Sequence, residues 1–205
     1  MSAAAVRRVS ALGAWAVGGL VVQAALAALA VGIALVHGPG FDDEGTASVY
    51  PVIALLQALV FVAAGIVVLV WIYRTTANVG AFGAENLSAG PKLAVASYFI
   101  PIVNLVMPFQ AMRDVWKASV EPRNWEVVKT PPVLGWWWLF WLVGNILGLV
   151  SFRLTDSVEF PEAGPIAEKL LTASDVCTIA ASLLLATIVR RVTALQQARV
   201  AVRAE

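Results

Sequence analysis

Long uncharged apolar blocks constrain the fold of this chain more than any other feature. Five such blocks occur, at residues 9–41, 45–73, 93–112, 130–152 and 170–189, and Asp175 alone interrupts the last one. A helix rises about 1.5 Å per residue, so about 20 apolar residues cross a hydrocarbon core of about 30 Å. Each block is therefore long enough to span a membrane, in a chain that is 60% hydrophobic and 13% charged.

The positions of the cations distinguish a four-span protein from a five-span one. Lys and Arg collect in cytoplasmic loops because they resist translocation. Twelve of the 14 cations are cytoplasmic if residues 93–112 do not cross, and six are if they do. We therefore predict an all-α integral membrane protein with both termini in the cytoplasm and acidic outer loops. The predicted spans lie near residues 12–36, 51–73, 133–150 and 165–189.

The segment at residues 91–119, between the second and third predicted spans, is apolar at first and then amphipathic. Pro101 and Pro108 each remove a backbone donor, so a straight helix through both is disfavoured. One helical stripe beyond the break is apolar and the opposite side is polar. The apolar stripe consists of Leu105, Phe109, Met112 and Trp116. The polar side consists of Gln110, Arg113, Asp114 and Lys117. We predict a re-entrant helix that breaks near Pro101–Pro108 and returns as an interfacial helix.

Asn104 lies inside this predicted break, where broken backbone is tolerated only beside protein or water. Two interpretations stay open. In the first, the break lines a binding site or pathway that involves Asn104, Gln110 and Arg113. In the second, the break is a structural kink and Asn104 pairs with the backbone groups that the prolines leave free.

Three stretches of the chain resemble one known family. The end of the second helix reads Trp71-Ile-Tyr-Arg74-Thr-Thr-Ala-Asn78, and the third helix begins Pro132-Val-Leu-Gly135-Trp136-Trp137. The most specific stretch runs from Tyr98 to Trp116 as YFIPIVNLVMPFQAMRDVW. Over residues 51–195 the chain is similar to the bacterial membrane proteins called domain of unknown function 4328. The resemblance implies a multi-pass protein of the bacterial cytoplasmic (inner) membrane and implies no activity.

A second candidate site lies at the cytoplasmic end of the second helix. Arg74 and Asn78 are one turn apart there, and with Arg113 and Lys117 they would form a basic pocket. Such a pocket suits anionic lipid head groups or another phosphate-bearing ligand. The alternative is that the cations are anchors at the membrane surface and Asn78 caps the helix.

Other polar residues in the spans are interpreted as structural. We predict an ion pair between Asp175 and Arg153, with a proton or ion site as the alternative. Gly144 and Gly148 form a GxxxG pattern around Asn145, which predicts close helix packing and a hydrogen bond from the amide across the contact. The aromatic residues Trp136, Trp137, Trp138 and Trp141 are expected to anchor the third span at the interface.

Composition excludes several classes of function. With His37 and Cys177 as the single His and Cys, no metal or haem ligand set is expected, so we predict no cofactor. A net charge of +1 does not indicate nucleic-acid binding. We expect a non-enzymatic membrane module that binds lipids or a partner, either a membrane protein or a second copy. The alternative is a small solute transporter or oligomeric channel with its path through the Pro101–Pro108 break.

Overall fold

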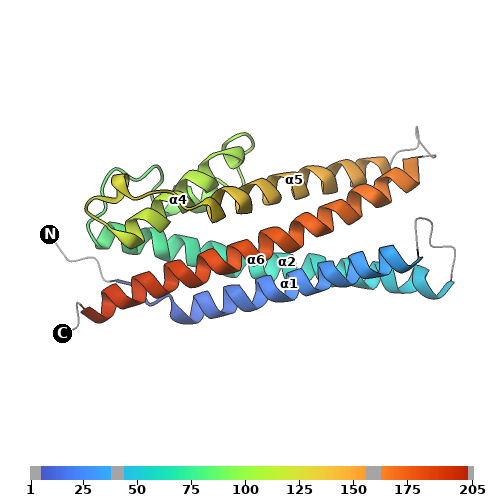
Figure 1. The fold of residues 1–205 in the computed structure, drawn as a ribbon, viewed down its shortest axis with the longest axis horizontal. Helices are drawn as coiled ribbons and strands as arrows, with labels where there is room; N and C mark the ends of the chain where they lie inside the picture. The colour runs from blue at the N-terminus through green and yellow to red at the C-terminus, as the bar shows by residue number, and fades with distance from the viewer. Residues whose placement is uncertain (1–5, 38–43, 156–162, 203–205) are drawn as a thin grey trace. The chain divides into compact units, whose positions relative to one another are not determined.

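The structure is a computed structural model that describes residues 6–37, 44–155 and 163–202. Within these ranges every regular element is helical (Figure 1). The predicted acidic loop residues Asp42, Asp43, Asp156, Glu159 and Glu162 lie outside the described residues. In chain order the elements are α1 (Ser10–His37), α2 (Glu44–Ala81), α3 (Pro91–Ala96), the 3₁₀ turn η1 (Val103–Leu105), α4 (Met107–Val120), the 3₁₀ turn η2 (Trp125–Val127), α5 (Pro132–Thr155) and α6 (Gly164–Val202).

Four of the described helices are long and apolar enough to cross a membrane, which confirms the predicted number of spans. They correspond to Ser10–Val36, Pro51–Ala81, Pro132–Thr155 and Gly164–Val202. The α2 and α6 helices contain 38 and 39 residues, about 57 Å each at 1.5 Å per residue. Both therefore continue past the predicted span ends at residues 73 and 189. The apolar run in the sequence identifies only the part of a helix that lies in the hydrocarbon core. Packing against other helices extends the helix beyond that part.

The chain divides into two compact units, and each long helix contributes to both. Unit 1 contains residues 1–18, 64–135 and 184–205, and unit 2 contains residues 19–63 and 136–183. Large buried side chains such as Trp71, Val115 and Ile188 form the core of unit 1. In unit 2 many buried residues of α1 are alanines, including Ala24, Ala27 and Ala30, and such small residues let helix backbones approach closely.

The segment at residues 91–119 is not one helix, as the two prolines predict. The α3 helix ends at Ala96, and turns lead through η1 into α4. Ile102, directly after Pro101, has a φ of 68°, a value that β-branched residues rarely adopt. The segment is therefore broken by a sharp local turn of the backbone at Ile102 and not by a gradual bend. Insertion of the segment into a membrane stays a prediction.

The predicted membrane-facing stripe of Leu105, Phe109, Met112 and Trp116 is exposed only in part. Leu105 is 53% exposed, and Phe109 and Trp116 are half-buried. Met112 is buried against protein, and Asp114, expected on the polar side, is only 1% exposed. The buried face consists mainly of Pro108, Ala111, Met112, Val115, Ala118 and Ser119. Three of these residues are Ala or Ser, which carry little hydrophobic signal but permit close packing. The stripe drawn through the largest apolar side chains was therefore rotated away from the face that packs.

The tryptophans at the start of α5 are only partly an exposed anchor. Trp136 is 55% exposed, whereas Trp137 and Trp138 are buried. The Trp138 ring stacks on Trp141, with 4.7 Å between the ring centroids. Adjacent residues on a helix point in directions about 100° apart, so consecutive tryptophans cannot all face the same surroundings.

Candidate functional site

The candidate site in unit 1 begins with the chain just before α1. The backbone N–H of Arg7 donates to Asn78 Oδ1 at 2.8 Å, and Asn78 Nδ2 donates to the Arg7 carbonyl at 2.9 Å. A single amide side chain thus pairs with both backbone groups of one residue, much as a neighbouring strand would. Val9 is almost completely buried beside it. These contacts fix the N-terminal segment against α2.

A buried polar network extends from Asn78 to two other helices. Asn78 Nδ2 also donates to Gln196 Oε1 of α6 at 3.0 Å. Gln196 Nε2 donates in turn to the Thr75 carbonyl of α2 at 3.2 Å and to Ser119 Oγ of α4 at 3.0 Å. Asn78, Gln196, Thr75 and Ser119 are each at most 1% exposed. Because buried polar groups are costly when unpaired, this connected network specifies how α2, α4 and α6 meet within unit 1.

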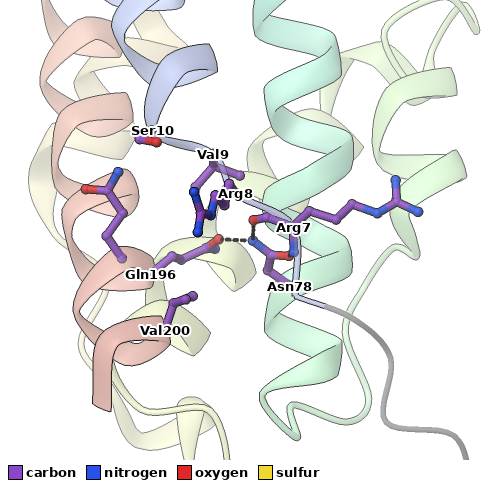
Figure 2. A pocket seen from close by; sticks show the side chains of 8 residues that line it. Arg7, Arg8, Val9, Ser10, Asn78, Gln196 and Val200 are labelled. Atoms are coloured by element: carbon purple, nitrogen blue, oxygen red, sulfur yellow. Dashed lines mark hydrogen bonds between the residues drawn. The ribbon is translucent and has the colours of Figure 1, made fainter. Parts of the chain in front are cut away.

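A pocket of about 230 Å³ lies over this network. Six polar residues and two valines line it, and most of the lining surface is contributed by apolar atoms. The lining residues are Arg7, Arg8, Val9, Ser10, Asn78, Gln196, Gln197 and Val200. Figure 2 shows the Arg8 side chain between α6 and Asn78, while the Arg7 side chain extends away to the other side. The Arg7 guanidinium lies 5.2 Å from the centre of the Tyr73 ring, a cation–π contact. Arg8 is therefore the cation that this arrangement leaves to the pocket.

The predicted basic pocket of Arg74, Asn78, Arg113 and Lys117 is not assembled. Arg74 donates to the Arg8 carbonyl at 3.4 Å, which places it with the N-terminal segment. Arg113, by contrast, pairs with Asp114 at 2.9 Å. Lys117 donates to the Glu126 carbonyl and lies over the Trp125 ring. Arg113 and Lys117 thus bond to groups near α4. Asn78 instead lies with Arg7 and Arg8.

The break near Asn104 has a different character from the N-terminal site. Asn104 Oδ1 is buried and has no hydrogen-bond partner within the described part of the chain. The groups that the prolines leave free are carbonyls, which would pair with the amide N–H groups of Asn104 and not with this oxygen. Gln110 and Arg113 are half-buried on α4. The residues around the turn are exposed and apolar, with Ile102 82% and Phe99 70% exposed.

Asp175, the carboxylate of the last predicted span, pairs with Gln57 in unit 2. Gln57 Nε2 donates to Asp175 Oδ1 at 3.2 Å, from α2 to α6. The predicted ion pair with Arg153 is wrong, since Arg113–Asp114 is the one ion pair among the described residues.

The register of α5 against α6 explains the missing ion pair. Ser151 Oγ donates to the Ala167 carbonyl, and Ser174 Oγ donates to the Gly144 carbonyl. In this antiparallel register Arg153 lies level with about residue 165. Ten residues of helix, about 15 Å, then separate it from Asp175. Arg153 and Asp175 therefore lie at different heights along the axes of the paired helices α5 and α6.

The GxxxG pattern of α5 packs as predicted, but the amide of Asn145 does not form the predicted hydrogen bond across the contact. A Cβ added at Gly144 would lie 3.1 Å from Cys177 Cβ, and one added at Gly148 would lie 3.1 Å from Ser174 Oγ. The two glycines therefore permit close approach to α6. Asn145 is exposed and donates to the Trp141 carbonyl of its own helix at 2.6 Å. The Asn145 amide therefore lies beside the contact between α5 and α6 and makes no hydrogen bond across it.

Sequence reasoning missed Gln196, Ser119 and the backbone of Arg7 as partners of Asn78. The predicted last span ended at residue 189, so Gln196 lay beyond it and no role was predicted for it. One signal was present: Val189, Val192, Gln196 and Arg199 follow one another at helical spacing. A helix that continues at this spacing carries Gln196 on the same face as buried valines.

The helices and the buried contacts between them define a multi-pass α-helical membrane protein. The family described as domain of unknown function (DUF4328) matches residues 44–194. The chain belongs to this family, as its resemblance indicated. No curated protein and no solved structure matches the chain.

Proposed function

We propose that this protein is a non-catalytic, lipid-binding module of the bacterial cytoplasmic membrane, with both termini in the cytoplasm. The observation that carries the proposal is the exposed apolar turn at residues 99–106. Its large apolar side chains are exposed by 41–82%: Phe99, Ile100, Ile102, Leu105 and Val106. Apolar surface left in water costs about 25 cal/mol per Å². A chain with four membrane-spanning helices offers lipid as the medium that covers this turn.

The flanking residues support insertion from the cytoplasmic side. Lys92 begins the segment and is exposed, and Arg113 follows the turn on α4. Cations at both ends of an apolar turn suit the anionic lipid surface of a cytoplasmic leaflet. The positive φ of Ile102 fits a hairpin that enters and leaves on one side. A turn that enters and leaves on the same side does not cross the membrane, so it adds no span to the four.

The alternative of a transporter or channel finds less support. A path through the Pro101–Pro108 break would be lined by groups that protein encloses. Ile102, at the tip of the turn, is instead 82% exposed. The N-terminal pocket supports a non-catalytic role, since its lining includes neither a histidine nor a carboxylate to serve as a base.

The test uses two single cysteines in a Cys177→Ser background, each carrying an environment-sensitive fluorophore, in lipid nanodiscs. One is Ile102→Cys and the control is Val127→Cys, which is 72% exposed in the same unit. We expect lipids that carry quenchers to quench the probe at position 102, and aqueous iodide to quench the probe at 127. Iodide quenching of both probes would refute insertion. Protection of position 102 from both quenchers would indicate a protein partner instead of lipid.

A further inference from the structure

We propose that the pocket formed by residues 7–10, α2 and α6 binds a phosphate group. The inference does not depend on insertion of residues 99–106, because it concerns another part of unit 1. The pocket of about 230 Å³ is smaller than the about 300–1,000 Å³ of sites that enclose drug-sized ligands. Its size suits a compact polar group, such as a lipid headgroup phosphate or a free phosphate.

The donors in the pocket are separated from the groups that maintain the fold. Asn78 and Gln196 form its floor, and their amides are occupied by Arg7, Thr75 and Ser119. Their hydrogen bonds hold the floor in place and leave the rim to Arg8, Ser10 and Gln197. A rigid floor below free donors is the arrangement expected of a preformed binding site.

Arg8 supplies the charge of the site. No carboxylate within the described ranges lies within ion-pair distance of its guanidinium, since the ion pair found there joins Arg113 to Asp114. The Arg8 backbone is held because its carbonyl accepts a hydrogen bond from Arg74. A guanidinium on a fixed backbone offers paired N–H groups that match two phosphate oxygens. The binding cation is thus positioned without being neutralised.

The start of α1 adds a second, independent contribution. The first intrahelical hydrogen bond runs from the Gly13 N–H to the Val9 carbonyl, so the N–H groups of residues 10–12 precede it and have no intrahelical acceptor. Val9 stands at the capping position, and its side chain has no acceptor to offer. The N-terminus of this 28-residue helix therefore directs unpaired donors and a positive dipole toward the pocket, where Ser10 forms part of the lining.

No acidic side chain lines the pocket. The side chains left to bind an anion are Arg8, Ser10 and Gln197. The Arg7 guanidinium lies against Tyr73, and the amides of Asn78 and Gln196 are already paired. Val200 and Val9 supply the apolar part of the pocket, which would contact the glycerol or acyl portion of a lipid. Phosphate is therefore the group recognised, and the source of that phosphate is decided by experiment.

The test measures binding to the full chain in maltoside micelles, which contain no phosphate. One arm titrates inorganic phosphate and the other titrates short-chain phosphatidylglycerol, each against sodium chloride at equal ionic strength. Arg8→Gln removes the charge, and Gln197→Glu places an anion on the exposed rim. Arg123→Gln is the control, since it removes an exposed cation of unit 1 that lies outside the pocket.

We expect Arg8→Gln and Gln197→Glu each to weaken binding about tenfold, and Arg123→Gln to leave it unchanged. Loss in both arms would assign the site to phosphate from any source, and loss in the phosphatidylglycerol arm alone would assign it to the lipid. The proposal is overturned if the parent binds neither probe. Equal losses in all three variants would overturn it too, because they would reflect bulk charge. Unchanged melting temperatures establish that the variants are folded.

Discussion

Asn78 holds the backbone of Arg7 by two hydrogen bonds, one accepted at 2.8 Å and one donated at 2.9 Å. This pairing joins the N-terminal segment to α2 across 71 positions of sequence. The same amide reaches Gln196 on α6. One side chain therefore determines where the N-terminal arginines lie, and with them the rim of the pocket.

Replacement of Asn78 should destabilise unit 1 measurably. Asn78→Ala leaves the Arg7 backbone groups and Gln196 Oε1 without their partner, and an unpaired buried group costs about 1–3 kcal/mol. We expect a lower unfolding midpoint in denaturant titrations in micelles. Asn145→Ala is the control, because that exposed amide bonds only to its own helix. Equal midpoints for the two variants would show that the Asn78 network does not stabilise the fold.

Gly13 and Thr193 should be energetically coupled. A Cβ at position 13 would lie 2.6 Å from Thr193 Oγ1, the atom that accepts the Trp71 indole N–H at 3.0 Å. Gly13→Ala should therefore cost about 1–3 kcal/mol, as overpacking does. Thr193→Ala removes the obstructing hydroxyl, so the double variant should lose less than the sum of the single variants. Strict additivity in this double-mutant cycle would contradict the close approach.

The approach of α5 to α6 can be tested at one glycine. Gly144→Ala places a Cβ 3.1 Å from Cys177 Cβ, an atom next to the backbone that cannot rotate away. We expect a loss of about 1–3 kcal/mol in unfolding experiments. Gly135→Ala, on the same helix, meets nothing within 4 Å and should be neutral or slightly stabilising. If position 144 tolerates alanine as well as position 135 does, the two helices are not in close contact.

Asp175 should be coupled to Gln57 and not to Arg153. In a double-mutant cycle, Asp175→Leu and Gln57→Leu should show a coupling energy of about 0.6 kcal/mol, the average for hydrogen bonds between membrane helices. The cycle of Asp175→Leu with Arg153→Leu should show none, because the helix register separates the two residues by about 15 Å. The opposite ranking would restore the ion pair that the sequence suggested.

Topology can be measured by thiol labelling in intact cells. With Cys177 replaced by Ser, Ala163→Cys should react with an impermeant reagent and Val127→Cys should be protected. The reason is the cation distribution, which predicts that the connection between α2 and α5 lies in the cytoplasm. Neither substitution removes a cation, so the orientation signal is preserved. Labelling at 127 together with protection at 163 would mean that residues 93–112 cross the membrane or that the whole chain is inverted, and either result would refute the four-span topology with cytoplasmic termini.

The sequence by itself determined the class of protein and the number of spans. Lipid offers no hydrogen bonds, so a spanning segment needs a long uninterrupted apolar run. Such a run can be recognised directly in the amino-acid sequence. The two prolines likewise excluded a single helix through residues 91–119, because each one removes a local backbone donor. Gly144 and Gly148 were identified for the same reason, since the lack of a side chain is a local property.

The tertiary structure alone decided which polar groups meet. Asn78 and Gln196 are 118 positions apart, as are Gln57 and Asp175, and nothing local pairs them. Arg153 and Asp175 carry opposite charges on neighbouring helices, yet the register of α5 on α6 separates them. The inward face of α4 also depended on packing, because Ala111, Ala118 and Ser119 give no strong hydrophobic signal. Contacts of this kind follow from the relative register of whole helices, which is fixed only when all of their side chains pack together.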